Sequence, residues 1–475
     1  YSYIISEKQF LNGYEVDNML VNITVENFKS FDKKEELSMI SSSKIQENKS
    51  HRIKIKQTNL LKNAVIYGAN ASGKSNLVKS LEFIKTVIME GLPVESVNDY
   101  CRNKDSNKDR ESVFELQFTV GDKFYAYGFA AVLSRRKIIE EWLYELMQDG
   151  NANNLFSRDG GNMPKLGDGI RLSSAEKNRF NVYAEDFMGN ETGLFLTEMN
   201  RGKRYEDNSK FIFFKKVFEW LINNIIIINP DRGISSDEVY YTKESLDTVS
   251  KLIETFDTGV NEINTKEITP EELSKMIPKD VMLNIFDSIK LKMQLENLKK
   301  MQMTWRIGEG FFNIRIRENS EPEITTIVLK HGKSIFDFSE ESNGTKRLID
   351  LIYMLTIKQD DIVFVVDELE RSLHTKLTEH FIEMFMESHK EERIQLIFTT
   401  HENAIMDKKI FRRDEIWFIE RDNNNVSVIY SLDKFKERYD KKLSKAYLEG
   451  RYGAIPVFKQ FQFNRNKFQE KSLNR

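Results

Sequence analysis

The sequence predicts an α/β protein whose core is a mostly parallel sheet, and three observations support this fold class. Apolar runs typical of buried strands alternate with helical patterns from residue 345 onward. An apolar segment, 63–67, leads through a glycine-containing loop into a helical pattern over 75–90. A further apolar run, 362–366, is followed by two carboxylates, as expected of a central strand whose carboxyl end carries a site.

The first third of the chain predicts mainly strands. Alternating residues indicate a strand over 20–28, with which 36–40 can pair. Residues 138–146 fit either a strand or a helix, and 150–169, rich in Gly, Asn and Asp, are expected to form a loop. The other elements expected here are a polar loop over 48–58, the glycine loop with its strand and helix, a charged linker over 99–111, and a hairpin of 113–120 with 124–132.

Residues 173–303 have a mainly helical pattern, which predicts an insertion that serves as an arm or a dimerisation layer. Helices are clearest over 211–222, 246–256, 270–276 and 281–300, and strand-like runs follow at 304–307, 311–316 and 323–330. The last part predicts helices over 345–357, 372–389 and 433–448 and strands over 362–366, 395–399, 415–419 and 426–430. We therefore expect an N-terminal extension (1–18), a first lobe (19–172), the helical insertion (173–303), a second lobe (304–456) and a basic tail (457–475).

Composition limits the class of protein. The 475 residues suffice for two or three domain-sized units, and 40% hydrophobic with 31% charged residues favours a globular fold. A net charge of −3 gives no global electrostatic argument for nucleic-acid binding. The most apolar run, 220–230, is too short to span a membrane and indicates a helix end leading into a buried strand. The single cysteine, Cys101, excludes an internal disulfide and fits a reducing compartment, so we expect a cytoplasmic protein without a membrane partner.

Residues 68–75, GANASGKS, have the G-x-x-x-x-G-K-S pattern of a phosphate-binding loop. In a strand–loop–helix arrangement, the backbone N–H groups of the loop and the N-terminus of the helix point at the same place and can bind one anionic group. Lys74 is expected to reach the β- and γ-phosphates, and the Ser75 hydroxyl to ligate Mg²⁺. The residues expected to surround the phosphates are Gly68, Asn70, Ala71, Ser72, Gly73, Lys74, Ser75 and Asn76. The alternative is a glycine turn that opens a helix and binds no ligand.

Three later motifs are candidates for the same site. Asp367 is expected to hold the Mg²⁺ shell and Glu368 to act as general base toward water, although a solvated acidic turn is the alternative. His401, at the end of an apolar strand, can hydrogen-bond a γ-phosphate, although a histidine in such a position is usually structural. Ser342 and Gly344 open a helix and can contact a phosphate, or Ser342 is simply its N-cap.

Together with the segment 370–374 (ERSLH), these motifs resemble the head of ABC-type ATPases, in the order Walker A, signature, Walker B, D-loop and switch histidine. The resemblance implies a mixed sheet with an antiparallel β subdomain, ATP and Mg²⁺ as ligands, and catalytic roles for Lys74, Glu368 and His401. In such heads the signature faces the phosphate loop of a second head, which implies a homodimer or higher homo-oligomer. The signature of this chain is S-x-G rather than LSGGQ, and Gln117 is a weak candidate for the Q-loop glutamine.

The motifs GANASGKSN, ESNGTKR and DELERSLH and the segment 450–456 (GRYGAIP) resemble the OLD-like, SMC-related ATPases of bacterial anti-phage defence, of the RloA, AriA or PtuA type. This resemblance implies an ATPase subunit that senses infection, through a phage-derived trigger or nucleic acid, and controls a separate effector. No D-x-D motif follows His401 and the six histidines are scattered, so we expect neither a TOPRIM nor an HNH nuclease site in this chain. The effector, a TOPRIM-like or HNH nuclease or a toxin, is therefore expected to be a partner protein. The alternatives are an SMC-like DNA repair or maintenance ATPase acting on DNA directly, and a transporter motor, which the unconventional signature disfavours.

Overall fold

The computed structural model describes residues 18–230, 242–277, 282–283, 286–287, 289, 293, 299–307, 310–317, 320–357, 359–435 and 443–455. Nearly all of the expected N-terminal extension, the basic tail, and most of the helix expected over 281–300 lie outside the described residues. Among the residues that are described, no helix combines the length and the apolar character needed to cross a membrane.

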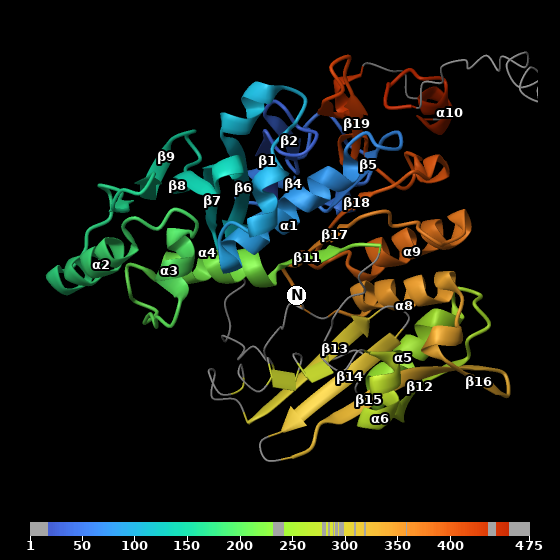
Figure 1. Ribbon diagram of the computed structural model, residues 1–475. Helices are drawn as coiled ribbons and strands as arrows, with labels where there is room; N and C mark the ends of the chain where they lie inside the picture. The colour runs from blue at the N-terminus through green and yellow to red at the C-terminus, as the bar shows by residue number, and fades with distance from the viewer. Residues whose placement is uncertain are drawn as a thin grey trace, which may run out of the picture.

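A six-stranded sheet forms the centre of the molecule (Figure 1). Its strands, in spatial order, are β11 (Ile225–Ile228), β17 (Val363–Val366), β18 (Gln395–Thr399), β5 (Asn63–Tyr67), β19 (Ile416–Arg421) and β20 (Ser427–Ser431). The first five run parallel, and β20 is antiparallel to β19. Val366 lies opposite Phe398, which lies opposite Val65. The carboxyl ends of β17, β18 and β5 are therefore level at one edge of the sheet, where α/β proteins bind ligands.

Helices cover both faces of this sheet, because successive residues of its strands point into two different hydrophobic cores. In β5, Ala64 and Ile66 belong to one core, and Val65 and Tyr67 belong to the other. The helices are α1 (Lys74–Glu90) and α4 (Ile212–Asn223) in the first core, and α8 (Asn343–Thr356), α9 (Thr375–Ser388) and α10 (Leu443–Leu448) in the second. The predicted alternation of strands and helices is confirmed.

A seven-stranded antiparallel sheet packs beside α1. Its order is β10 (Lys165–Leu166), β9 (Ala152–Asp159), β8 (Lys137–Leu146), β7 (Lys123–Val132), β6 (Ser112–Val120), β1 (Leu20–Glu26) and β2 (Glu35–Ser38). The hairpin prediction is confirmed as β6 and β7, but the loop predicted over 150–169 is wrong. There, β9 pairs with β8 and buries Leu155 and Phe156, so pairing at the sheet edge outweighs the Gly- and Asn-rich composition.

The polar loop predicted over 48–58 is also wrong. Four of its residues form β3 (Arg52–Ile55), which follows a short 3-10 helix (Lys49–His51) and pairs with β4 (Thr58–Leu61). Ile55 and Leu60 of this hairpin lie in a small core with Met19 and Val21. Burial of these apolar side chains stabilises the hairpin, and it depends on contacts with residues at the start of the first strand.

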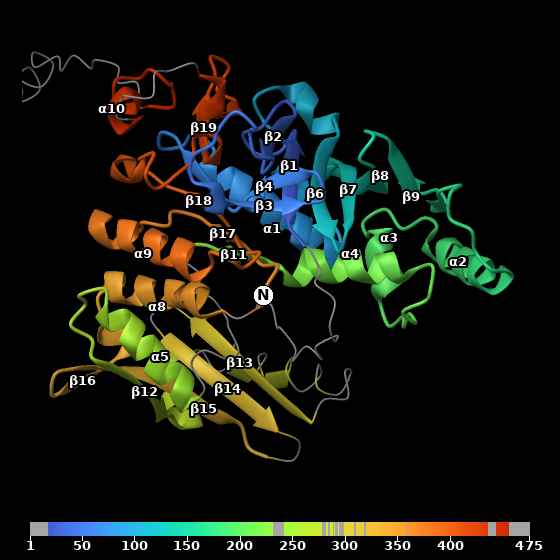
Figure 2. The ribbon, with the colours of Figure 1, turned by 180° about the vertical axis from the view of Figure 1, so that it is seen from behind.

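The described residues of the segment 173–303 include both helices and strands, and one of these strands belongs to the central sheet. The segment contains α2 (Ser174–Phe187), α3 (Phe195–Asn200), α4, α5 (Lys243–Glu254) and α6 (Pro270–Met276). Between α4 and α5, four isoleucines form β11 of the central sheet, because β-branched residues fit a strand that packs beside β17. β12 (Glu262–Glu267) joins an antiparallel sheet with β13 (Lys300–Ile307), β14 (Gly310–Arg317), β15 (Glu323–His331) and β16 (Ser334–Asp337). This sheet and α5 pack against α8 (Figure 2).

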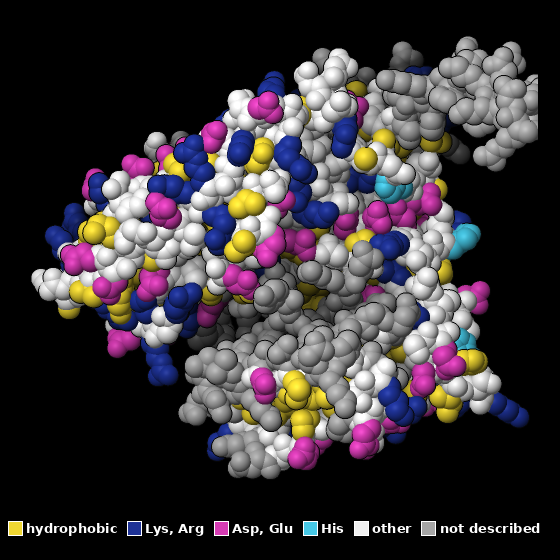
Figure 3. Space-filling model, in the orientation of Figure 1, with side chains coloured by type: hydrophobic (Ala, Val, Ile, Leu, Met, Phe, Trp, Pro, Cys, Tyr) yellow, Lys and Arg dark blue, Asp and Glu magenta, His cyan; other side chains and the backbone are white. Residues whose placement is uncertain are grey.

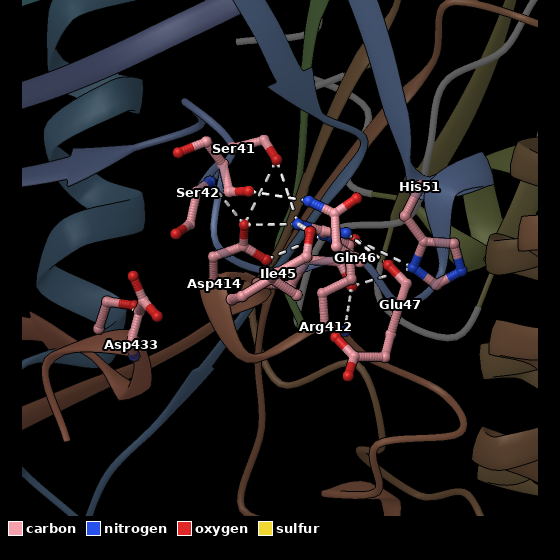
Figure 4. A network of polar contacts seen from close by, with 12 residues as sticks. Ser41, Ser42, Ile45, Gln46, Glu47, His51, Arg412, Asp414 and Asp433 are labelled. Carbon is pink, nitrogen blue, oxygen red and sulfur yellow. Dashed lines mark hydrogen bonds and ion pairs between the residues drawn. The ribbon is translucent and has the colours of Figure 1, made fainter. Parts of the chain in front are cut away.

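A buried polar network joins the segment before β3 to the start of β19 (Figure 4). Arg412 donates to both carboxylate oxygens of Asp414, at 2.9 Å and 2.8 Å. The carboxylate of Glu415 accepts from Asn63 Nδ2 at 3.1 Å and lies 3.0 Å from Nδ1 of His51. Because Asn63 is the first residue of β5, this network fixes the amino end of the strand that leads to the phosphate-binding loop.

Candidate functional site

The phosphate-binding loop predicted from the sequence lies between β5 and α1, at the carboxyl edge of the central sheet. Two of its residues have left-handed backbone conformations, Ala71 at φ 61° and Gly73 at φ 116°. Gly73 immediately precedes α1 and Ser72 is buried, whereas Asn70 and Ala71 are exposed. A turn of this kind gathers backbone N–H groups at a helix N-terminus, where the partial positive charge of the helix adds to them.

Close packing from behind fixes the shape of this loop. A Cβ atom on Gly68 would lie 2.3 Å from the carbonyl oxygen of Ile419, and one on Gly73 would lie 2.2 Å from Ser427 Oγ. Ser427 Oγ also lies 2.7 Å from Ser30 Oγ, which belongs to the turn after β1. Both glycines of the pattern are therefore required by contacts with segments far away in the sequence.

Lys74 lies in the middle of the site. Its Nζ donates to two loop carbonyl oxygens, at 2.8 Å and 3.2 Å, and lies 3.4 Å from Nδ1 of His401. Burial lowers the pKa of Lys74 to about 8, while the charges of Glu370, Asp367 and Glu368 oppose this shift. The lysine of the loop, the histidine after β18 and the carboxylates after β17 therefore share one electrostatic environment.

The two candidate carboxylates follow β17 in a turn that the neighbouring strand positions. Asp367 is buried, and its Oδ1 accepts a hydrogen bond from the Thr399 hydroxyl at 2.6 Å. The same hydroxyl oxygen accepts the backbone N–H of Glu368 at 2.8 Å. Glu368 has φ 49°, a left-handed conformation that is uncommon outside glycine and that clusters at functional sites. One threonine at the end of β18 thus holds both residues.

His401 lies two residues after the end of β18. The residue between them, Thr400, still donates its N–H to the Ile66 carbonyl oxygen of β5 at 3.0 Å. The N–H of His401 instead donates to Oε1 of Glu370 at 2.6 Å. Although much of the residue is exposed, loss of solvent around the ring and then the charge of Lys74 lower the pKa of the imidazole. A neutral imidazole beside Lys74 can either donate or accept a hydrogen bond.

The predicted signature lies at the start of α8, beside the turn that follows β17. Ser342 is the N-cap, and its hydroxyl accepts the Thr345 N–H at 3.1 Å. A Cβ atom on Gly344 would lie 2.9 Å from the carbonyl oxygen of Ser372. Arg347 donates to the carbonyl oxygens of the two residues after β17, at 3.3 Å and 3.1 Å. Within the described part of the chain, neither Ser342 nor Gly344 hydrogen-bonds to the phosphate-binding loop.

Sequence reasoning missed four residues that support this site: Thr399, Glu370, Ser30 and Ser427. Thr399 and Glu370 stand inside the quoted motifs, so a polar residue at the end of a buried strand was the available signal. Ser30 and Ser427 come from opposite ends of the chain, and no sequence pattern connects them. Asn76, expected near the phosphates, donates from Nδ2 to Ser30 Oγ at 2.8 Å.

The structure places the weak Q-loop candidate, Gln117, on β6 of the antiparallel sheet, where its Nε2 donates to Glu115 at 3.1 Å. The residue that follows the strand next to β17 is Asn229. In that strand, β11, the carbonyl oxygen of Ile228 accepts a hydrogen bond from the Asp367 N–H at 2.9 Å. Asn229 therefore follows a strand that ends at the same sheet edge as the carboxylates, a position that the sequence did not reveal.

One family model, described as AAA domain, putative AbiEii toxin, Type IV TA system, matches residues 64–407. The chain belongs to this AAA family. The matched range begins in β5 and ends just after His401, so it contains every motif that converges on the site. The predicted fold class, that of an ABC-type P-loop head, is confirmed by the mixed central sheet and the separate antiparallel sheet. A comparison with curated proteins gave no significant match.

Solved structures of SMC heads show distant similarity to this AAA domain. One is the SmcHead bound to the C-winged helix domain of ScpA, at 13% identity and TM-score 0.34, covering 87% of this chain and 98% of that chain. Another is the SMC head domain from Thermotoga maritima, at 14% identity and TM-score 0.32, covering 87% and 98%. A third is the Smc head domain with an extended coiled coil bound to the C-terminal domain of ScpA, derived from Pyrococcus furiosus, at 14% identity and TM-score 0.34, covering 92% and 100%. TM-scores this low carry no conclusion about function or partners.

Proposed function

We propose that this AAA domain hydrolyses ATP as a head-to-head dimer and serves as the ATPase subunit of a bacterial anti-phage defence system. The observation that best supports the ATPase site is the convergence of Lys74, Asp367, Glu368 and His401 at one edge of a parallel sheet. A structural role explains any one of these residues, but it does not explain all four at one site.

The residues at the site fit a nucleoside triphosphate with Mg²⁺. The Ser72 hydroxyl is buried in the loop without a hydrogen-bond partner among the described residues, which a bound anion would explain. Backbone N–H groups of 70–76 and the Lys74 ammonium would bind phosphate oxygens. Ser75 and Asp367 would hold Mg²⁺, which prefers one or two protein oxygens together with phosphate oxygens and water. When bound, Mg²⁺ neutralises charge on the phosphates.

Glu368 is the proposed general base. It would take a proton from the water whose oxygen forms a bond to the γ-phosphorus, while the bond to the bridging oxygen breaks and ADP leaves with phosphate as the second product. His401 would hydrogen-bond the γ-phosphate, and Lys74 would offset its negative charge. The left-handed backbone at Glu368 and the hydrogen bond from its N–H to Thr399 support a fixed position for the backbone that carries this carboxylate.

A second copy of the chain would complete the site. Ser342 is exposed and its hydroxyl is engaged with its own helix rather than with the phosphate-binding loop. The exposed N-terminus of α8 can therefore bind the γ-phosphate held by another chain, with Ser342 and Gly344 as its contacts. This arrangement supports a homodimer formed through the heads.

The defence role rests on the OLD-like resemblance of the motifs, and the family description, which names a putative toxin of a toxin–antitoxin system, is compatible with it. We propose a cytoplasmic protein that responds to a phage-derived trigger or nucleic acid and controls a partner nuclease or toxin. The SMC-like alternative predicts salt-dependent binding of DNA by the chain alone. On the face shown in Figure 3, basic and acidic side chains are interspersed, so this face offers no uniformly basic surface for DNA.

Purified protein tests the ATPase proposal. Wild type should release phosphate from ATP, and Glu368→Gln should bind ATP but turn over about 10²- to 10⁴-fold more slowly, because the base is lost. The matched control is Glu387→Gln on α9, whose side chain is 80% exposed and which should leave turnover unchanged. Wild-type turnover by Glu368→Gln would remove the base assignment, and absence of ATP binding by wild type would overturn the proposal.

A phage challenge tests the biological role. Cells carrying the gene and its genomic neighbour should resist phage, and Lys74→Ala should abolish resistance. Deleting the neighbour should also abolish it, because the effector chemistry is assigned to the partner. Undiminished protection by this chain alone would contradict the two-component arrangement.

A further inference from the structure

Glu370 connects two parts of the candidate site that come from different segments of the chain. It lies two residues after Glu368, in the turn that follows β17, and its Oε1 accepts the backbone N–H of His401 at 2.6 Å. Its second oxygen, Oε2, is buried and has no hydrogen-bond partner among the described residues. The residue is half-buried, and burial of one carboxylate oxygen without a partner is costly, so the position of this side chain calls for an explanation.

The contact with Glu370 is the fourth link between this turn and the end of β18. In the first, the Thr399 hydroxyl donates to Oδ1 of Asp367 at 2.6 Å. The Leu369 N–H donates to the Thr399 carbonyl oxygen at 3.1 Å, and the Glu368 N–H donates to the Thr399 hydroxyl at 2.8 Å. These three links end at the last residue of the strand. His401 lies past the strand, and the side chain of Glu370 extends the same cross-link to its amide.

The position of His401 matters because its ring meets Lys74. Nδ1 of His401 lies 3.4 Å from Nζ of Lys74, and Glu370 is the leading favourable charge acting on that ammonium group. A displacement of the His401 backbone would move the ring away from the phosphate-binding loop. Misplacement by about 1 Å at such a site can cost on the order of 100-fold in rate.

We propose that Glu370 is a positioning residue of the ATPase site, whose carboxylate holds the His401 amide and so sets the imidazole beside Lys74. This assignment rests on the proposed function, and it concerns a residue that none of the expected nucleotide or metal contacts includes. Two conservative variants separate the hydrogen bond from the charge. Glu370→Gln keeps an acceptor oxygen at the same reach and loses the charge, whereas Glu370→Asp keeps the charge and withdraws it by about one bond length, ~1.5 Å.

The hydrogen bond predicts how the two variants rank in kcat. Glu370→Gln should keep kcat within about threefold, and Glu370→Asp should lower kcat about tenfold or more with a much smaller change in KM. Hydrogen exchange at the His401 amide should be slow in wild type and Glu370→Gln and faster in Glu370→Asp. In a His401→Ala background, Glu370→Asp should have no further effect on kcat, because both changes remove the same contribution.

The opposite ranking of kcat, with Glu370→Asp active and Glu370→Gln impaired, would overturn positioning by the hydrogen bond. It would also be overturned if the reductions in kcat from Glu370→Asp and His401→Ala multiplied in the double variant. Unchanged His401 exchange in Glu370→Asp would overturn it as well, and this readout needs no turnover. If wild type neither binds nor hydrolyses ATP, the proposed function fails, whereas the exchange experiment still decides whether Glu370 holds His401. Glu387→Gln serves again as the exposed-carboxylate control.

Discussion

Single residues carry the phosphate chemistry proposed for this site, and Lys74 is the most constrained of them. Its side chain turns back onto the loop that carries it and is buried there, with carbonyl oxygens and His401 as neighbours. Burial of a cation is costly unless an anion is close, and the carboxylates after β17 only partly offset that cost. A phosphate group would supply the missing negative charge.

Lys74→Ala should weaken ATP binding by about 100-fold or more, because a charge-assisted contact to phosphate is lost from a desolvated site. Titration of a fluorescent ATP analogue measures this. The matched control is Lys79→Ala, an exposed lysine on the same helix, which should leave affinity within about twofold. Intact affinity in Lys74→Ala would refute the phosphate role of this lysine.

Gly73 offers a second residue-scale prediction, since its φ is 116° and a Cβ atom would lie 2.2 Å from Ser427 Oγ. Gly73→Ala should lower the free energy of unfolding by about 2–4 kcal/mol and weaken ATP binding. Gly121→Ala is the control, because Gly121 also has a positive φ, 65°, but has no atom within 4 Å of a Cβ. It should cost only about 1 kcal/mol, from backbone strain alone. If urea unfolding gave the same loss of unfolding free energy for Gly73→Ala and Gly121→Ala, packing behind the loop would contribute nothing to stability.

Among the structural elements, the turn 27–32 after β1 links the antiparallel sheet to the phosphate-binding loop. Its Ser30 contacts Ser427 and Asn76 behind that loop. Asp32, at the end of the turn, is buried and accepts hydrogen bonds from Lys104 and Asn107, both at 2.8 Å. The segment predicted as a charged linker over 99–111 is therefore an ordered partner of this turn.

Asp32 gives the turn a dependence on pH. Burial opposes its ionisation, but hydrogen bonds from Lys104, Asn107 and Asn103 outweigh burial and lower the pKa from 3.8 to about 2. Because the pKa in the folded state is depressed, the stabilisation is fully present above pH 3.8 and is lost as pH falls through about 2. The unfolding free energy of the wild type should therefore approach that of an uncharged variant only in strong acid.

Asp32→Asn should destabilise the protein by about 1–3 kcal/mol at pH 7, and the difference from wild type should shrink between pH 4 and pH 2. Urea unfolding at several pH values measures this. Asp109→Asn, whose side chain is 61% exposed in an ion pair with Arg135, should change stability by less than about 0.5 kcal/mol. A difference that persists unchanged at pH 2 would mean that Asp32 acts through packing and not through its charge.

At the scale of the whole molecule, the proposed ATP site is shared between two chains, and this can be tested by mixing variants. Ser342→Arg should fold, because Ser342 is exposed, but should block the ATP site to which it contributes on the second head. Neither Ser342→Arg nor Lys74→Ala alone should hydrolyse ATP at more than about 1% of the wild-type rate. Mixed in equal amounts, they should form heterodimers in which one of two sites is intact, and part of the activity should return. No recovery, with heterodimers shown by cross-linking, would contradict sharing of the site.

Local sequence patterns were sufficient to predict the separate segments that carry the candidate site. The G-x-x-x-x-G-K-S loop with its flanking strand and helix, the run 362–366 before Asp367 and Glu368, and the strand before His401 could all be predicted. Each depends on apolar periodicity or on a glycine turn, which are properties of neighbouring residues. The order of these segments then indicated an ABC-type head before any strand had been placed beside another.

How these segments come together depends on contacts between residues far apart in the chain. The register between β17, β18 and β5 brings three segments to one edge of the sheet. Parallel pairing with β17 places the isoleucines of β11 in the same sheet. The support from Thr399, Glu370, Ser30 and Ser427 depends on side-chain contacts between distant segments. Such contacts leave no periodic pattern in the sequence, because they are selected by the geometry of packing and hydrogen bonding and not by the preferences of adjacent residues.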